Sequence, residues 1–274
     1  MDLGIKGLRV IVTAGAAGIG CEVARTFQRE GAQVHICDVD RTALAELATS
    51  DPKLKASVCD VSDRDAVARF IDATADALGG LDCLVNNAGI AGPTGRVDEI
   101  PPEEWDRTLA VNITGQFNCV RAAVRHLAKS GNPSIINLSS TAGRLGFPLR
   151  TPYAASKWAA VGFTKSLAIE LGPLKIRVNA IQPGAVEGDR IRRVFAAKAQ
   201  VRGVSMQAMQ EEALSHASIK EMIAPQQLAD MMVFLASSRG RTISGQAISI
   251  CGDVQSLFQS VIDLTDSIVA LRFW

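Results

Sequence analysis

The residues that could do chemistry begin with a tyrosine and a lysine four positions apart. Tyr153 and Lys157 stand in the segment YAASK, which opens a helical pattern over residues 153–171. Positions i and i+4 share one face of a helix, so the phenol and the ammonium are expected side by side. A phenol ordinarily has a pKa of about 10, and a neighbouring positive charge favours its ionised form. The pair therefore predicts a tyrosine that exchanges a proton near neutral pH, although the same spacing also arises by chance.

A serine stands at the end of a buried strand shortly before this pair. Residues 133–139 (PSIINLS) are typical of such a strand, and Ser140 follows at its carboxyl end. Ligands of open parallel sheets bind at that edge, so Ser140 is a candidate for contact with a ligand.

A glycine-rich turn near the start of the chain could hold a phosphate. Residues 13–20 (TAGAAGIG) join an apolar strand to a helical pattern. Glycines let the backbone approach a pyrophosphate, and a helix N-terminus offers free N–H donors. The next strand ends in Asp38, 18 residues after Gly20, and its carboxylate could accept hydrogen bonds from ribose hydroxyls and repel a 2′-phosphate. Plain structural turns are the alternative interpretation of both features.

Seven apolar, β-branched runs alternate with helix-length segments and must position these groups. Such alternation predicts βαβ units and a parallel sheet covered on both faces. The chain of 274 residues shows no repeat or linker, so we expect one α/β domain with a doubly wound, seven-stranded parallel sheet and helices on both faces. The expected strands are residues 8–13, 33–38, 54–60, 81–87, 133–139, 175–182 and 246–251.

Composition narrows the possible partners and compartments. Lys plus Arg number 29 and Asp plus Glu 28, so the net charge of +1 provides no field to gather nucleic acid or a membrane surface. The six cysteines form no C-x-x-C pair, which favours reduced thiols over disulfides. The three histidines have no Cys or carboxylate partners at the spacing of metal ligands, so no metal is expected. No membrane-length apolar run or signal-peptide pattern is found, and we expect a cytoplasmic protein.

These motifs resemble the short-chain dehydrogenase/reductase superfamily from about residue 8 to 252. The resemblance also rests on Asn86-Asn87-Ala88-Gly89 at the fourth strand, on Asn112 in AVNITG and on Pro183-Gly184 after RVNAIQ. It implies a Rossmann fold and, because members are commonly tetramers, a homotetramer.

The resemblance implies a catalytic tetrad of Ser140, Tyr153, Lys157 and Asn112. Tyr153 would transfer the proton, Ser140 would hold the substrate oxygen, Lys157 would lower the Tyr153 pKa and bind the nicotinamide ribose, and Asn112 would position a relay water. Implied contacts to an NAD cofactor are Gly15, Gly18, Ile19, Gly20, Asp38, Asp60, Val61, Asn87, Ala88, Gly89, Tyr153, Lys157, Pro183, Gly184 and Val186.

The implied activity is hydride transfer between NAD(H) and a secondary alcohol or ketone, with a polar sugar, polyol or acid among the candidate substrates. An NADPH-dependent carbonyl or 3-ketoacyl-thioester reductase is the alternative. Asp38 argues against it, as does Ala17, where phosphate-binding relatives tend to have Arg or Lys. A non-catalytic dinucleotide-binding protein is a further alternative, but it would be expected to lack Tyr153 or Lys157.

Three positions depart from the superfamily pattern. Ala14 replaces the usual glycine, so a positive φ there would cost about 1 kcal/mol unless Gly15 absorbs it. Val186 follows Ala185 where a threonine after the Pro-Gly turn is usual, and Cys251-Gly252-Asp253 replaces Asp-Gly-Gly. These changes touch cofactor contacts and leave the tetrad intact.

Residues 184–225 are expected to form a lid that sets substrate specificity. Cationic residues flank the expected entrance and could grip an anionic substrate, or simply form solvated faces and subunit contacts. They are Arg144, Arg150, Arg190, Arg192 and Arg193. Apolar lid residues either line a pocket or pack lid helices: Val186, Ile191, Val194, Phe195 and Met206.

The C-terminal extension, residues 254–274, carries apolar residues every three or four positions, as an amphipathic helix requires. We expect it to pack across a subunit interface, with packing onto its own subunit as the alternative. The stripe consists of Leu257, Val261, Leu264, Ile268 and Leu271.

Overall fold

A sheet of seven parallel strands runs through the part of the chain that the computed structural model describes, residues 2–257. The strand order is β3-β2-β1-β4-β5-β6-β7. The direction of strand addition reverses between β1 and β4, so their carboxyl ends border the crevice where open α/β sheets bind ligands. The strands are β1 (Arg9–Thr13), β2 (Gln33–Asp38), β3 (Lys55–Val58), β4 (Cys83–Asn86), β5 (Ser134–Leu138), β6 (Arg177–Pro183) and β7 (Ala247–Ile250).

Each of these strands coincides with one predicted from the sequence. The sixth extends one residue beyond its predicted range, to Pro183, and the others lie within theirs. The prediction of a doubly wound Rossmann sheet is therefore confirmed.

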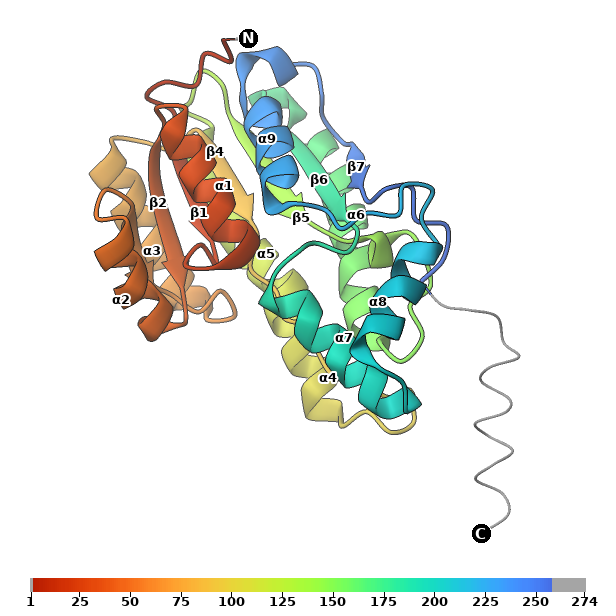
Figure 1. The fold of residues 1–274 in the computed structure, drawn as a ribbon. Helices are drawn as coiled ribbons and strands as arrows, with labels where there is room; N and C mark the ends of the chain where they lie inside the picture. The colour runs from red at the N-terminus through yellow and green to blue at the C-terminus, as the bar shows by residue number, and fades with distance from the viewer. Residues whose placement is uncertain (1, 258–274) are drawn as a thin grey trace, which may run out of the picture.

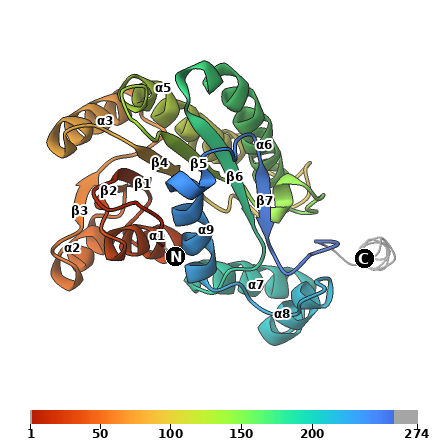
Figure 2. The same ribbon diagram turned by 90° about the horizontal axis from the view of Figure 1, so that it is seen from above.

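Helices cover both faces of the sheet (Figure 1). Seen from above, α1, α2 and α9 lie on one side and α3, α5 and α6 on the other (Figure 2). Within residues 2–257, no helix is both long and apolar enough to span a bilayer. The helices are α1 (Gly18–Arg29), α2 (Arg41–Ser50), α3 (Arg64–Leu78), α4 (Pro102–Leu109), α5 (Gly115–Leu127), α6 (Thr151–Glu170), α7 (Asp189–Arg202), α8 (Met206–Ser215) and α9 (Pro225–Ala236), with shorter turns η1 (Ala110–Thr114), η2 (Thr141–Gly143), η3 (Gly172–Leu174) and η4 (Ser238–Gly240).

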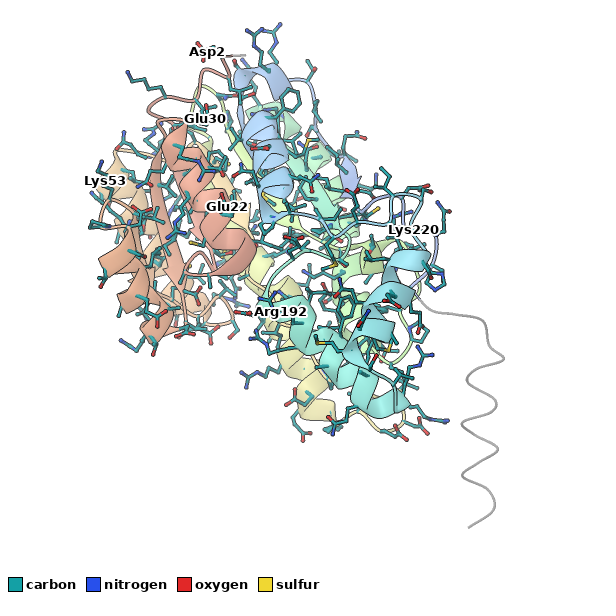
Figure 3. All side chains as sticks on the ribbon, viewed as in Figure 1. Asp2, Glu22, Glu30, Lys53, Arg192 and Lys220 are labelled. Carbon is teal, nitrogen blue, oxygen red and sulfur yellow. The ribbon has the colours of Figure 1, made fainter. Side chains whose placement is uncertain are left out.

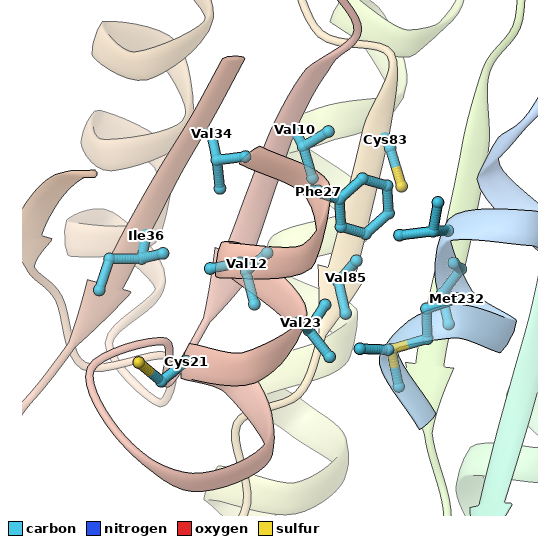
Figure 4. Close-up of a cluster of buried hydrophobic side chains, with 14 of the residues drawn as sticks. Val10, Val12, Cys21, Val23, Phe27, Val34, Ile36, Cys83, Val85 and Met232 are labelled. Atoms are coloured by element: carbon cyan, nitrogen blue, oxygen red, sulfur yellow. The ribbon is translucent and has the colours of Figure 1, made fainter. Parts of the chain in front are cut away.

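The alternation of side chains along β1 explains why a hydrophobic core lies on each face of the sheet. Val10 and Val12 point to the face covered by α1, where they join Phe27 (Figure 4). Ile11, between them, points to the opposite face and joins the second cluster. Successive side chains of a strand face opposite sides of the sheet, so an uninterrupted apolar strand supplies both cores.

The helices α7 and α8 follow β6 and lie beyond one end of the sheet (Figure 1). Phe195 and Ala199 of α7 pack with Met209 of α8 in a small buried cluster of their own. Phe195 therefore packs between these two helices, which is one of the two interpretations that the sequence left open. Met206 is exposed.

A short segment after β7 fastens the far end of this region. Gln255 donates from its backbone N–H to the carbonyl of His216 at 2.8 Å, and Ile219 donates likewise to Gly252 at 2.9 Å. Val254 pairs with Ala217 in an isolated bridge. The chain over 254–257 is thus not helical, and the helix predicted for the remaining extension falls on residues 258–274, outside the described residues.

Candidate active site

Tyr153 and Lys157 lie in the first two turns of α6, where the i and i+4 spacing brings them together. The Lys157 Nζ lies 5.6 Å from the centroid of the Tyr153 ring. It donates a hydrogen bond to the carbonyl of Leu138 at 2.8 Å, so the end of β5 fixes the ammonium. Ser140, two residues further on, is close enough to the Tyr153 phenol to lower its pKa through a hydrogen bond to the phenolate. Three predicted residues from two elements thus meet.

Two opposing effects act on the Tyr153 phenol. Burial raises its pKa, but Lys157, Arg190, the hydrogen bond from Ser140 and Arg150 together outweigh burial, so the pKa lies below the ordinary value. Burial also lowers the pKa of Lys157 to about 8, against the opposing influence of Tyr153. This setting favours the phenolate, so the phenol gives up its proton more readily than an ordinary tyrosine.

Asn112 sits at the centre of the π-helical turn η1, between α4 and α5, and is fully buried. Its Oδ1 accepts from the backbone N–H of Ile90 at 2.7 Å, and its Nδ2 donates to the Ile90 carbonyl at 3.0 Å and to Ser156 Oγ at 3.0 Å. Both amide hydrogens are therefore in use. The side chain fixes the loop after β4, and a water beside it could bind only to Oδ1 or to backbone groups.

The glycine-rich loop closes tightly against the end of β4. Asn87 donates from Nδ2 to the carbonyls of Thr13 at 3.0 Å and Ala14 at 2.9 Å. A Cβ atom on Gly20 would lie 2.1 Å from the Ala14 oxygen and 2.4 Å from Asn87 Nδ2. Only glycine fits at position 20.

Ala14 has a φ of +50°, in the left-handed region that disfavours a side chain. The possibility that Gly15 would absorb this conformation is wrong, because Gly15 is not among the positive-φ residues. Gly15 is required for space instead, since a Cβ there would lie 2.6 Å from Ile36 Cβ. Alanine is held in this conformation by the hydrogen bond from Asn87.

Asp38 braces the same loop from the end of β2. Its Oδ2 accepts from the backbone N–H of Ala16 at 3.1 Å. None of the described side chains caps the first turn of α1, so N–H groups there remain free for an anion. A dinucleotide would fit these groups, with its pyrophosphate at the first turn of α1 and a ribose at Asp38.

The remaining predicted contacts also lie at carboxyl ends of strands. Asp60 follows β3 and accepts from the N–H of Ser62 at 2.8 Å. Gly89 follows β4, and a Cβ on it would lie 3.1 Å from Asn112 Oδ1 and 3.5 Å from Lys157 Nζ. Gly184 follows β6 and packs against Cys251. Because all the strands are parallel, the strand ends and following segments at one sheet edge also contain Gly18, Ile19, Val61, Ala88, Pro183 and Val186.

The arginines at the expected entrance separate into two groups. Arg144 donates to the Val254 carbonyl at 2.7 Å and so fastens the segment after β7. Arg192, on α7, pairs with Asp189 at 2.6 Å on the exposed side of the helix (Figure 3). Neither contacts Tyr153 in the described structure, and binding of an anionic substrate by Arg144 stays a prediction.

Arg150 does lie at the site. It is 3 % exposed, and its guanidinium carbon is 5.6 Å from the Tyr153 ring centroid. Arg190 donates to the Gly89 carbonyl at 3.1 Å. Sequence reasoning missed Lys198, whose Nζ lies 4.3 Å from the Phe147 ring centroid. The feature of the sequence that could have indicated Lys198 is its position eight residues after Arg190, on one stripe of a helix.

Among residues 2–257, no cluster of three or more His, Cys, Asp or Glu side chains could hold a metal ion.

Comparison with known proteins decides the family. A family model described as enoyl-(acyl carrier protein) reductase matches residues 14–253. The 3-oxoacyl-(acyl-carrier-protein) reductase FabG of Thermotoga maritima is 33% identical over 252 residues, covering 90% of this chain and 98% of the relative. The chain belongs to the short-chain dehydrogenase/reductase superfamily.

Other superfamily members resemble the chain over nearly its whole length. The D-beta-hydroxybutyrate dehydrogenase of Rhizobium meliloti is 31% identical over 249 residues, or 88% of this chain and 96% of the relative. A crystal structure of NAD+-bound xylitol dehydrogenase superposes with a TM-score of 0.86 at 28% identity, covering 91% of this chain and 99% of that one. The protein is thus a short-chain oxidoreductase of the kind that acts on alcohol or carbonyl groups.

Proposed function

We propose that this protein is an NAD(H)-dependent dehydrogenase that transfers hydride between nicotinamide and a secondary alcohol or ketone, with Tyr153 transferring the proton. The observation that carries the proposal is the Tyr153 phenol beside the buried Lys157 ammonium, with a pKa that Lys157 and Ser140 help to lower. This group lies at the same sheet edge as the glycine-rich loop.

Each residue of the site has a role in this proposal. When bound, the nicotinamide accepts hydride during oxidation and supplies it during reduction. Tyr153 takes the proton from the alcohol or returns it to the ketone oxygen, and Ser140 holds that oxygen by a hydrogen bond. Lys157 favours the phenolate through its charge. Asn112 is a positioning residue that holds Ile90 at the edge of the cofactor cradle.

NADH formation, followed by absorbance, tests the proposal on alcohols of distinct chemistry: polyols and sugars, sugar acids, hydroxy acids, aryl carbinols and sterols. Turnover of one class with NAD is the expected result. Retained NADH binding without turnover of any class, with either nucleotide, would favour a non-catalytic dinucleotide-binding protein instead.

The preference for NAD over NADP is expected to be at least about tenfold in kcat/KM. Asp38 would place a carboxylate against a 2′-phosphate, and like charges a few ångströms apart near a protein surface repel by about 4 kcal/mol. Asp38→Asn keeps an acceptor for the Ala16 N–H and should narrow the gap. Asp40→Asn, two residues on, is the control, because Asp40 only caps α2.

The NAD+-bound xylitol dehydrogenase supports this preference. The FabG relative keeps a 3-oxoacyl-thioester reductase as the second candidate function. Steady-state rates with NAD(H) and with NADP(H) separate the two candidate functions. Equal kcat/KM values with the two nucleotides would contradict the role of Asp38 and would point to Arg41, which begins α2 three residues later.

A cytoplasmic homotetramer is part of the proposal. All six cysteines are buried and free, which suits a reducing compartment. Two outer helices expose large apolar side chains: Phe117 on α5 is 42% exposed, and Trp158 and Ile169 on α6 are 52% and 79% exposed. Such surfaces are typical of subunit contacts.

Trp158→Glu is expected to reduce the mass measured by light scattering to that of a dimer or monomer, because it buries a charge in the proposed contact. Val58→Glu, on the edge strand β3 at the other end of the sheet, is the control, since Val58 is similarly exposed at 47%. An unchanged tetramer in Trp158→Glu would remove α6 from the interface, and a monomeric wild type would contradict the tetramer.

A further inference from the structure

Positive charge gathers beside Tyr153 on the side of the lid helices. Phe147 lies 6.3 Å from Tyr153 between ring centroids. The Arg150 guanidinium carbon lies 5.8 Å from the Phe147 centroid, and the Lys198 Nζ lies 4.3 Å from it. Phe147 thus lies in contact range of both the Tyr153 ring and Lys198.

No carboxylate balances these cations. In the described part of the chain, no Asp or Glu lies within ion-pairing distance of Arg150, Arg190 or Lys198. The neighbouring carboxylate, Glu212, is already bound through both oxygens by Arg202 at 2.6 Å.

The local groups hold the two cations without neutralising them. Arg150 donates to Thr94 Oγ1 at 3.3 Å and to the Ala91 carbonyl at 2.5 Å, but its buried Nε has no hydrogen-bond partner among the described residues. The Phe147 ring attracts the Lys198 ammonium but carries no net charge. Burial, Arg150 and Arg202 outweigh Glu212 and lower the pKa of Lys198 to about 8.

We propose that Arg150 and Lys198 form an anion subsite and that the substrate carries a carboxylate beyond its reacting carbon. The inference rests on the proposed function, since it names the substrate class of the same site. Arg150 presents planar donors and Lys198 a mobile charge, so together they suit a carboxylate entering past Phe147. The carboxylate would supply the ion-pair partner that Arg150 and Lys198 lack among the described residues.

Lys198 gives the cleaner test, because Arg150 also supports the loop that contains Ala91 and Thr94. The probes are two matched pairs, acetoacetate with methyl acetoacetate and levulinate with methyl levulinate, which differ in negative charge. Each is offered to the NADH-loaded enzyme. NADH oxidation reports turnover, and isothermal titration of the NADH complex reports binding where turnover is absent.

In the pair that fits the site better, the wild type is expected to favour the acid over its ester by about tenfold or more, in kcat/KM or in Kd. Lys198→Met should bring that ratio close to one, and Lys198→Arg should restore most of it. Lys220→Met is the matched control, because Lys220 lies exposed after α8 (Figure 3) and should keep the wild-type ratio.

Equal values for acid and ester in the wild type, or an unchanged ratio in Lys198→Met, would overturn the subsite. A weaker NADH Kd in Lys198→Met with no change in the ratio would overturn it too, by assigning Lys198 to the cofactor phosphates. Binding of the acids that depends on Lys198, but with no turnover of any alcohol or ketone, would support the subsite and contradict the proposed function. Turnover that favours the esters over the acids would support the proposed function and contradict the subsite.

Discussion

Tyr153→Phe is expected to lower kcat by roughly 10²–10⁴-fold, the contribution of a positioned general acid or base, while NADH affinity stays nearly unchanged. The substitution deletes only the hydroxyl, and the ring still fills the space against Phe147, whose centroid is 6.3 Å away. Steady-state kinetics and NADH titration measure the two effects separately. A variant that keeps more than about a tenth of the wild-type rate would contradict the role of Tyr153.

The pH profile gives this prediction a second readout. Alcohol oxidation needs the phenolate, so its rate should rise with pH, with an apparent pKa below the ordinary phenol value because of Lys157, Arg190 and the hydrogen bond from Ser140. Ketone reduction needs the phenol and should fall over the same range. Burial also lowers the pKa of Lys157 to about 8, so the positive charge that favours the phenolate is itself lost as the pH rises. Tyr153→Phe should abolish the inflection.

Two lysines on α6 provide a matched comparison. Lys157→Met should reduce both turnover and NADH affinity, because the buried ammonium lies at the phenol and at the proposed ribose contact. Lys165→Met, eight residues further along the helix at an exposed position, should change neither. Equal losses in both variants would show a general effect on α6 rather than a local charge effect.

Gly20→Ala is expected to weaken NADH binding by at least about tenfold and to lower the free energy of unfolding by about 1–3 kcal/mol, as overpacking does. The added Cβ would lie 2.1 Å from the Ala14 oxygen, so the glycine-rich loop must move. That movement separates Asn87 from the carbonyls that it holds. Calorimetric titration with NADH and thermal unfolding check the two effects.

Gly18→Ala separates crowding from backbone strain in the same loop. A Cβ on Gly18 meets no atom within 4 Å, but its φ is +54°, so the expected loss is about 1 kcal/mol of stability from conformation alone. Wild-type NADH affinity in Gly20→Ala would contradict the tight closure of the loop.

The fold and most of the candidate site could be predicted because they depend on local patterns. Apolar runs specify strands, and strands that all run in one direction bring Gly20, Asp38 and Ser140 to one edge whatever the intervening helices do. The tyrosine and lysine needed only the helical repeat to become neighbours.

The remaining features depend on contacts between segments distant in sequence. Arg144 and Arg150 look equivalent along the chain, yet one binds the carbonyl of Val254 and the other that of Ala91. The left-handed conformation of Ala14 likewise depends on Asn87, 73 residues away. Lys198 entered the site only through the docking of α7, which the periodicity of one helix does not specify.

The pairing of residues 216–219 with 252–255 fixes the segment that contains α7 and α8 along two edges. One edge is the end of β6, and the other is fastened to the sheet through β7 and to Arg144, which belongs to the loop after Ser140. If α7 and α8 move away from the sheet, we expect the displacement to be largest near Gly203, between the two helices, and smallest beside Ser140. The geometry around Ser140 should then be kept while that turn moves.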